Sequence, residues 1–374
     1  MQNLRKFNIY ILLSSFSKSL IEVFVPIILY KAGFRIEEII FYSLLKFSFI
    51  LFLNPVICLI GKIIKFNWLN IFAIIFFYIG YYYLFNIEHN ITSLFFLALF
   101  LVLYEHSYWV ARHYLALKIL DKEKIASEVG GFLIMTQIAL IPSSFIGALL
   151  IKNLDIKLLL LIISSLLIVS SLIIFRIKIY DKNKNKNNIN EITKVIKNMP
   201  KRSIIFLMIE QFRMIGSFLF VLYLYKYVSE NLTYIGVFNI VVGVASIIFV
   251  YFFSKKMDKS KKDYLIVSSL FVTIIWILKL NITSSLLMII IALFQGLSER
   301  MYEVSNSRNM YSLGKHYDSM IYIMITESIY NIARIIICLI GFVFIKDLKL
   351  FLYLCGIMIF VAGLIGFDDK EKNI

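Results

Sequence analysis

Ionisable side chains stand inside otherwise apolar stretches of this sequence, and they are the residues best suited to bind or carry charge. Five are basic and six are acidic: Lys18, Lys46, Arg213, Arg300, Arg334, Glu22, Glu105, Glu210, Glu299, Glu303 and Glu327. A charged group at the centre of a bilayer costs roughly 2.5–3.5 kcal/mol on insertion scales. The near balance of sign therefore predicts that these groups pair with one another or face water.

Helical spacing places several of these charges on shared faces, because residues three or four apart are neighbours on a helix. The pairs are Lys18 with Glu22, Glu210 with Arg213, and Glu299 with Glu303. Two carboxylates on one face favour protonation of one of them, so Glu299 and Glu303 are the candidate proton carriers. Glu327, Asn331 and Arg334 form a further polar stripe at i, i+4 and i+7.

Two histidines near the segment YEHSYWVARHY raise the question of a metal. His106, Trp109 and His113 share one helical face, while Glu105 points about 100° away from His106. Structural zinc takes four protein ligands, so this set is incomplete and we expect no metal. We expect Trp109 and His113 at the membrane interface and treat His106 as a candidate cavity residue.

Other chemistry-bearing patterns are not found in the sequence. The three cysteines, at 58, 338 and 355, have no CxxC spacing and do not form an obvious disulfide set. The chain contains no phosphate-binding glycine loop, dinucleotide fingerprint or HExxH motif. We therefore expect neither a cofactor nor an enzyme.

The elements that must position these residues are membrane-spanning helices. Of the 374 residues, 60% are hydrophobic and 17% are charged, which excludes a water-soluble enzyme. A bilayer core requires roughly 20 apolar residues per helix. This criterion predicts twelve spans, at 7–30, 38–60, 67–86, 92–112, 129–151, 156–175, 203–225, 234–253, 264–280, 284–306, 319–344 and 350–367.

The distribution of basic residues along the chain predicts its orientation in the membrane. The chain has 39 Lys and Arg against 23 Asp and Glu, a balance of +16. Most basic residues fall at the N-terminus and in the loops on its side of the membrane, as the positive-inside rule describes for cytoplasmic loops. We expect a multi-pass protein of the cytoplasmic (cell) membrane with both termini in the cytoplasm. Its partners would be the lipid bilayer and a small solute, not nucleic acid, and we expect a monomer.

A basic loop divides the chain into two halves. It runs from Arg176 to Arg202, with nine basic and two acidic residues. Its second part contains apolar residues at helical spacing, which predicts a short amphipathic helix on the inner leaflet: Ile189, Ile192, Val195, Ile196 and Met199. We predict an N-terminal six-helix bundle at 1–176, a linker at 177–202 and a C-terminal six-helix bundle at 203–374.

An internal repeat supports this division. An offset of 194–195 residues aligns the halves and keeps charges and glycines in register: Lys18 with Arg213, Tyr30 with Tyr225, Lys31 with Lys226, Glu105 with Glu299, Gln137 with Asn331, and Gly147 with Gly341. Parallel repeats of six spans, related by an axis along the membrane normal, are a known transporter architecture.

Topology, central loop and repeat together resemble the major facilitator superfamily. After the eighth span, SKKMDKSKK is similar to that family's gate loop without its glycine, and GKIIKFN after the second span keeps Gly61 and Lys62 without the Asp. IPSSFIG, at 141–147, looks like a remnant of its exporter signature. The resemblance implies alternating access around a cavity lined by helices 1, 4, 7 and 10, with a cytoplasmic gate at Asp258, Lys259, Lys261 and Lys62.

These observations predict an all-α membrane protein whose two six-helix bundles are related by a pseudo-twofold axis. The predicted function is secondary active transport of a small solute by alternating access, with proton coupling as a hypothesis. The predicted solute and ion cavity contains Lys18, Glu22, Glu105, His106, Glu210, Arg213, Glu299, Arg300 and Glu303. The alternatives are an integral-membrane transferase acting on a lipid-linked substrate, and a transporter-like sensor that no longer translocates.

Overall fold

The computed structural model describes residues 2–64, 66–177, 188–260, 264–344 and 347–368. Within these ranges the chain forms helices and no strand. In order, they are α1 (Gln2–Ser19), η1 (Glu22–Phe24), α2 (Val25–Lys31), α3 (Ile36–Ile64), α4 (Phe66–Phe85), α5 (Ile91–Ile119), α6 (Ile125–Asn153), α7 (Ile156–Ile174), α8 (Asn188–Asn198), α9 (Lys201–Tyr227), α10 (Leu232–Ser260), α11 (Leu265–Leu280), α12 (Ser285–Gly314), α13 (Ser319–Val343) and α14 (Leu348–Ile365).

Most of these helices are long and apolar enough to cross a bilayer. Eleven spans meet that condition when Gln2–Lys31 is counted as one. The remaining predicted span, 264–280, corresponds to α11, an apolar helix of 16 residues. The expectation of an all-α, multi-pass membrane protein is therefore confirmed.

The first span is not one continuous helix, which corrects the prediction for 7–30. It breaks after Ser19, passes through a short 3-10 turn at Glu22–Phe24 and resumes as α2. Pro26 lies in the first turn of α2 and has no N–H to donate to the carbonyl four residues earlier, that of Glu22. The charged side chains of Lys18 and Glu22 lie at this break.

Three helices continue well beyond the predicted spans. α5 ends at Ile119 rather than at 112, α10 at Ser260 rather than at 253, and α12 at Gly314 rather than at 306. A criterion based on bilayer thickness counts apolar residues only, and the extra turns of α10 and α12 are mostly polar. Helical hydrogen bonding continues past the hydrocarbon core because water and headgroups satisfy polar side chains there.

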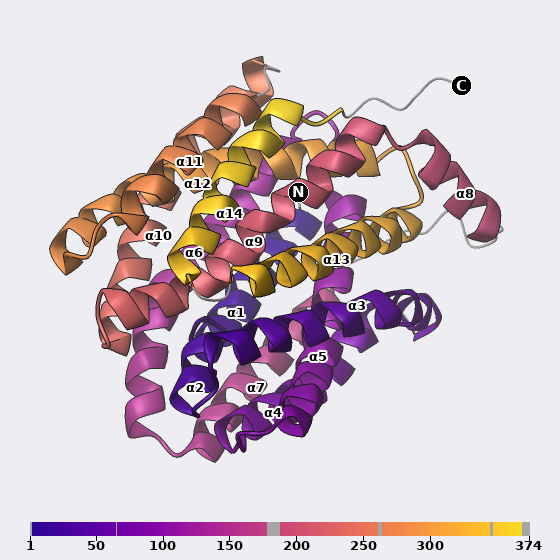
Figure 1. Ribbon diagram of the computed structural model, residues 1–374. Helices are drawn as coiled ribbons and strands as arrows, with labels where there is room; N and C mark the ends of the chain where they lie inside the picture. The colour runs from indigo at the N-terminus through magenta and orange to yellow at the C-terminus, as the bar shows by residue number, and fades with distance from the viewer. Residues whose placement is uncertain (1, 65, 178–187, 261–263, 345–346, 369–374) are drawn as a thin grey trace.

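The spans pack in two groups that follow the order of the chain (Figure 1). In the first half, α1 packs on α6 and α7, and α5 packs on α3 and α4. In the second, α9 packs on α13 and α14, and α12 packs on α10 and α11. Two long interfaces join the halves: α6 lies along α10, and α3 lies along α13. Figure 1 shows α3 and α13 side by side at this boundary.

The predicted helix of the central loop is α8. Val195 and Met199 are buried, whereas Ile196 is exposed, so the helix has one apolar face directed inward. α8 packs against α13 of the second half, and in Figure 1 it lies at the edge of the molecule. The side chain of Ile189 lies outside the described residues.

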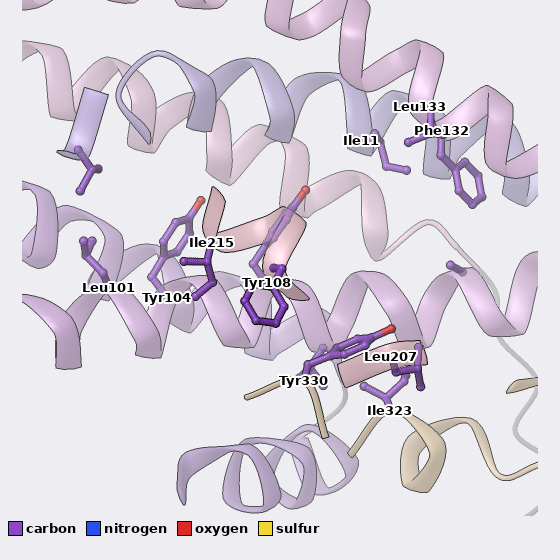
Figure 2. Packing of buried hydrophobic residues seen from close by; sticks show 14 of the residues in the cluster. Ile11, Leu101, Tyr104, Tyr108, Phe132, Leu133, Leu207, Ile215, Ile323 and Tyr330 are labelled. Carbon is purple, nitrogen blue, oxygen red and sulfur yellow. The ribbon is translucent and has the colours of Figure 1, made fainter. Parts of the chain in front are cut away.

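Buried aromatic residues join the two halves near the middle of the molecule. Tyr104 and Tyr108 of α5 lie near Ile215 of α9 and Tyr330 of α13 (Figure 2). All four belong to one continuous apolar cluster. In a bilayer such contacts stabilise by close packing, because lipid offers the same apolar environment as the protein interior.

Glycines allow the closest approach at the α6–α10 interface. A Cβ on Gly243 would lie 2.5 Å from Cγ1 of Ile141, and one on Gly236 would lie 3.0 Å from the backbone of Phe145. Small residues let helix backbones approach closely in membranes. The two halves therefore meet with little space between their main chains along this interface.

Gly147→Ala is expected to lower the free energy of unfolding by about 1–3 kcal/mol, the usual range for overpacking. Its Cβ would lie 2.1 Å from the carbonyl oxygen of Leu20, in the break after α1, and backbone cannot move aside easily. The matched control is Gly341→Ala at the repeat-related position, where the nearest atom is a Phe351 ring carbon at 3.3 Å. Thermal unfolding in detergent compares them, and equal midpoints would contradict the packing argument.

Candidate functional site

Two ion pairs form a charged cluster in the first half. Nζ of Lys18 lies 3.0 Å from the carboxylate of Glu22, as the spacing of these residues predicts. Nζ of Lys46 on α3 lies 2.5 Å from the carboxylate of Glu105 on α5. The second pair joins two helices, so its partners could not be read from spacing along the chain.

Aromatic rings surround the ammonium of Lys18. Its Nζ lies 4.1 Å from the ring centroid of Tyr108 and 5.3 Å from that of Trp109, with Tyr104 at 5.6 Å. Each ring attracts the cation by about 0.5–2 kcal/mol, most where water is excluded. Trp109, expected at the membrane interface, therefore contacts a buried charge.

The second half pairs its charges along single helices. Glu210 and Arg213 of α9 are joined at 2.7 Å, and Arg213 also lies over the ring of Tyr302 at 5.6 Å. On α12, Arg300 forms an ion pair with Glu303. Arg300 thus lies close to the carboxylate three residues on, as neighbours at i and i+3 on a helix do.

Lys279 is a charged residue that sequence reasoning missed. It lies in the last turn of α11, within the predicted span 264–280, and was not among the predicted cavity residues, yet its side chain is fully buried. Its Nζ lies 3.6 Å and 3.7 Å from the ring centroids of Trp276 and Phe220. It approaches Oε1 of Gln295 at 3.4 Å and the carboxylate of Glu299 at 4.0 Å.

The polar stripe on α13 is linked to α9. Nε of Arg334 donates to Oε1 of Gln211 at 2.8 Å, and its Nη1 donates to Oδ1 of Asn331. Gln211 in turn donates to Glu210. The Asn331 amide donates to the carbonyl oxygen of Glu327 at 2.7 Å. These contacts lie within the second half and fix α13 against α9.

Asn54 of α3 joins the halves at the other interface. Its amide nitrogen donates to the carbonyl oxygen of Met324 at 2.7 Å and to Oγ of Ser328 at 3.0 Å, both on α13. Its Oδ1 lies 3.0 Å from Nε2 of His106. His106, a predicted cavity residue, is therefore buried in a network across the α3–α13 interface.

A polar pocket of about 160 Å³ lies at the boundary of the halves, between α6 on one side and α9, α10, α11 and α12 on the other. Its polar lining residues are Gln137, Ser217, Asn239, Lys279, Gln295, Glu299 and Arg300. Its apolar lining residues are Leu140, Phe220, Val221, Leu224, Ile235, Phe238 and Val242. Of the nine predicted cavity residues, Glu299 and Arg300 line this pocket.

The other seven, Lys18, Glu22, Glu105, His106, Glu210, Arg213 and Glu303, do not line this pocket. Helices 7 and 10 of the expected set, here α9 and α12, contribute to the walls, but α1 and α5 do not. The physical reason is local pairing: most of these charges have close partners outside the pocket.

Four buried polar atoms in this pocket lack a hydrogen-bond partner within the described part of the protein. They are Nε2 of Gln137, Nδ2 of Asn239, Oε1 of Glu299 and Nε of Arg300. A buried polar atom without a hydrogen bond costs roughly 1–3 kcal/mol. Such a group of donors with an acceptor is suited to bind a small polar solute or ordered water.

Two charged residues of the second half hold the turn between α5 and α6. The carboxylate of Asp258 on α10 accepts from the backbone N–H groups of Ala126 and Ser127, at 3.0 and 2.8 Å. Nζ of Lys315, after α12, donates to the carbonyl oxygens of Leu117 and Leu120. The anion lies at the N-terminus of α6 and the cation at the C-terminus of α5, where each complements the helix dipole. We call Asp258 and Lys315 the inner latch.

Burial at the latch lowers the pKa of the Lys315 ammonium from its usual range, and the negative charge of Glu128 opposes that shift. One turn before Leu117 on α5, Nδ1 of His113 lies 2.9 Å from the hydroxyl of Tyr311 on α12. Contacts between the halves therefore close this end of the molecule.

The predicted gate residues other than Asp258 contribute no described contact to the latch. Lys259 is exposed at the end of α10. Lys261 and the side chain of Lys62 lie outside the described residues. Asp258 was expected beside cationic side chains, whereas the structure pairs its carboxylate with a helix N-terminus.

Comparison with known proteins agrees with this geometry. The family model of the Major Facilitator Superfamily matches residues 7–338. The human organic anion transporter MFSD10 has a similar structure, with a TM-score of 0.68 at 9% identity, covering 97% of this chain and 98% of that one. The E. coli fucose:proton symporter FucP has a TM-score of 0.66 at 14% identity, with the same coverage. A bacterial homologue of the iron transporter ferroportin, in an outward-facing state, has a TM-score of 0.66 at 15% identity and covers 98% of each chain.

No curated protein sequence matches this chain. At these identities the structural likeness shows the fold alone. The family match covers most of the chain, and two packed groups of apolar helices with a polar pocket between them are the features of a membrane transporter. The chain belongs to the Major Facilitator Superfamily.

Proposed function

We propose that this protein is a secondary active transporter that moves a small solute by alternating access. The observation that carries the proposal is the polar pocket at the boundary of the halves, with unpartnered buried donors and an unpartnered carboxylate oxygen. A fold that needed only stability would gain by replacing such groups with apolar residues. A solute that satisfies them compensates for the energetic cost of leaving them unpartnered in the empty protein.

Movement of one half against the other would expose the pocket to each side in turn. The α6–α10 and α3–α13 interfaces are the surfaces on which the halves would rock. The inner latch would hold the cytoplasmic end closed. We further propose that the protein is a monomer of the cell membrane, organised as 1–176, 177–202 and 203–374, with both termini cytoplasmic.

Proton coupling is part of the proposal. Glu299 lines the pocket, and Glu303 lies one turn further along α12 beside Arg300. A carboxylate that meets both solute and solvent can link solute binding to protonation. Uptake into vesicles should then increase when the outside is made acidic. Uptake that ignores an imposed pH gradient would remove proton coupling but leave the transport proposal.

The experiment for transport itself is isotope counterflow. Thermal-shift screening of the purified protein against a metabolite panel identifies a solute, and proteoliposomes preloaded with that solute then take up its labelled form. A working carrier shows a transient overshoot of label. Stoichiometric binding without counterflow would contradict transport and favour the sensor alternative.

Loss of the latch is expected to open the cytoplasmic end. Lys315→Met removes two charge-assisted hydrogen bonds, and such bonds contribute about 1.5–3 kcal/mol each. A shift of 1.4 kcal/mol is about tenfold in population. We expect a cysteine at Thr326, which lines a small cavity beside His113, to react about tenfold faster with a reagent added from the cytoplasmic side.

The matched control is Lys315→Arg, which keeps cationic donors at the same place and should leave the labelling rate near that of the parent. Both are made in a background without the buried cysteines Cys58, Cys338 and Cys355. An unchanged rate in Lys315→Met would show that Lys315 does not hold the cytoplasmic end closed.

A further inference from the structure

We infer that the pocket binds a small zwitterion with an apolar body, of the class of an apolar α-amino acid. This inference rests on the proposed function and names its substrate class. It starts from the hydrogen-bonding groups that the protein leaves unused in the pocket, continues with the balance of charge there, and ends with the shape of the apolar wall.

The unused groups are three donors and one acceptor. The donors are Nε2 of Gln137, Nδ2 of Asn239 and Nε of Arg300, and the acceptor is Oε1 of Glu299. A carboxylate offers two oxygens with about four acceptor sites, and it offers no donor. An ammonium offers donors only. A solute that carries both groups complements all four unpartnered atoms.

The charges around the pocket are balanced. Lys279 and Arg300 are cationic, and the carboxylates of Glu299 and Glu303 lie beside them. A solute with a net charge would disturb this balance in a region of low dielectric, which is costly. A zwitterion adds no net charge, and its two poles meet groups of opposite sign.

Lys279 is held in a position where it contributes charge. The rings of Trp276 and Phe220 cover its ammonium at less than 4 Å. Cation–π contacts of this kind stabilise a desolvated cation by about 2 kcal/mol. They hold the side-chain nitrogen of Lys279 4.0 Å from Glu299, so the carboxylate of a solute would find nitrogen donors on α11 and α12.

The remaining wall is apolar. Leu140, Val221, Leu224, Ile235 and Phe238 line it. The pocket, of about 160 Å³, has room for several waters. A single amino acid would replace those waters and place its apolar side chain against this wall.

The first arm of the test measures ligand binding by the purified full-length protein. L-leucine and L-valine are the probes, and thermal shift and calorimetry report binding. L-leucine methyl ester lacks the carboxylate charge, and 4-methylpentanoate lacks the ammonium. We expect both analogues to bind at least tenfold more weakly than L-leucine. A hexose serves as the neutral, hydroxylated comparison.

The second arm uses two variants whose expected loss of leucine binding could not be explained by a structural role of the replaced residue. Asn239→Leu and Gln137→Leu remove donors that bond to nothing described in the protein, so the unfolding midpoint should stay the same or rise. Leucine binding should nevertheless weaken tenfold or more. Weakened binding with an unchanged fold identifies these donors as ligand contacts.

The inference is overturned if neither amino acid binds at millimolar concentration, if either analogue or the hexose binds as well as L-leucine, or if the two variants bind L-leucine as the parent does. Counterflow separates this inference from the proposed function. Counterflow of another solute without leucine binding would leave transport standing and reject the zwitterion. Leucine binding without counterflow would support the zwitterion as ligand and reject transport.

Discussion

Glu299→Gln is expected to reduce counterflow of the transported solute by about a hundredfold or more. The substitution replaces the carboxylate 4.0 Å from the buried side-chain nitrogen of Lys279 with a neutral amide, whose oxygen is a weaker acceptor. Removing one partner of a buried ion pair costs about 3–5 kcal/mol, and 1.4 kcal/mol is a factor of ten. Counterflow in proteoliposomes measures the loss.

A double variant separates function from stability. Lys279→Met with Glu299→Met removes both charges, and replacing a buried ion pair with apolar residues is often neutral or stabilising. We expect its thermal unfolding midpoint to recover while counterflow stays lost. Glu37→Gln, in the first turn of α3 and away from the pocket, should have no effect. Recovery of counterflow in the double variant would mean that this pair is only structural.

Glu105→Leu is expected to destabilise the protein by about 3–5 kcal/mol, because it leaves Lys46 as an uncompensated charge inside the first half. Both side chains are less than one-fifth exposed, so water can compensate only in part. The measurement is the midpoint of thermal unfolding in detergent, compared with the parent protein at equal concentration.

For this pair, the double variant should restore both stability and transport. Lys46→Met with Glu105→Leu removes both charges, and neither residue lines the polar pocket. We expect the unfolding midpoint and counterflow to return to near the parent values. A double variant that is stable but inactive would place the Lys46–Glu105 pair in the solute pathway and contradict the assignment of the pathway to the pocket between α6 and the second half.

The sequence predicts the helices well because a bilayer imposes a length on each apolar run. The ends are less predictable: α10 and α12 continue in polar sequence that a hydropathy criterion does not recognise. The break in the first span had a visible signal in Pro26, which removes one helical hydrogen bond.

Pairs within one helix follow from spacing, and pairs between helices do not. Lys18 with Glu22 and Glu210 with Arg213 are neighbours because residues three or four apart lie on one face. The partner of Glu105 depends on which helix packs against α5, and that information is not local in the chain.

The pocket was predictable only in part. Glu299 and Arg300 stood out as charges within an apolar run, whereas Gln137, Asn239 and Ser217 are uncharged and carry no comparable signal. Lys279 lies at the end of an apolar stretch, where lysines usually reach the membrane surface. Trp276, three residues earlier, stacks on its ammonium and is the only local hint that this lysine is buried.

Two-sided labelling of the pocket tests alternating access most directly. A single cysteine at Ser217, on α9 in the pocket wall, is introduced in the cysteine-free background, and an impermeant maleimide is added to right-side-out or inverted vesicles. We predict labelling from the outside in the parent, and a shift toward labelling from the cytoplasm when the latch is weakened by Asp258→Asn and Lys315→Met. A site that is reached from one side only, whatever the state of the latch, would contradict transport through this pocket.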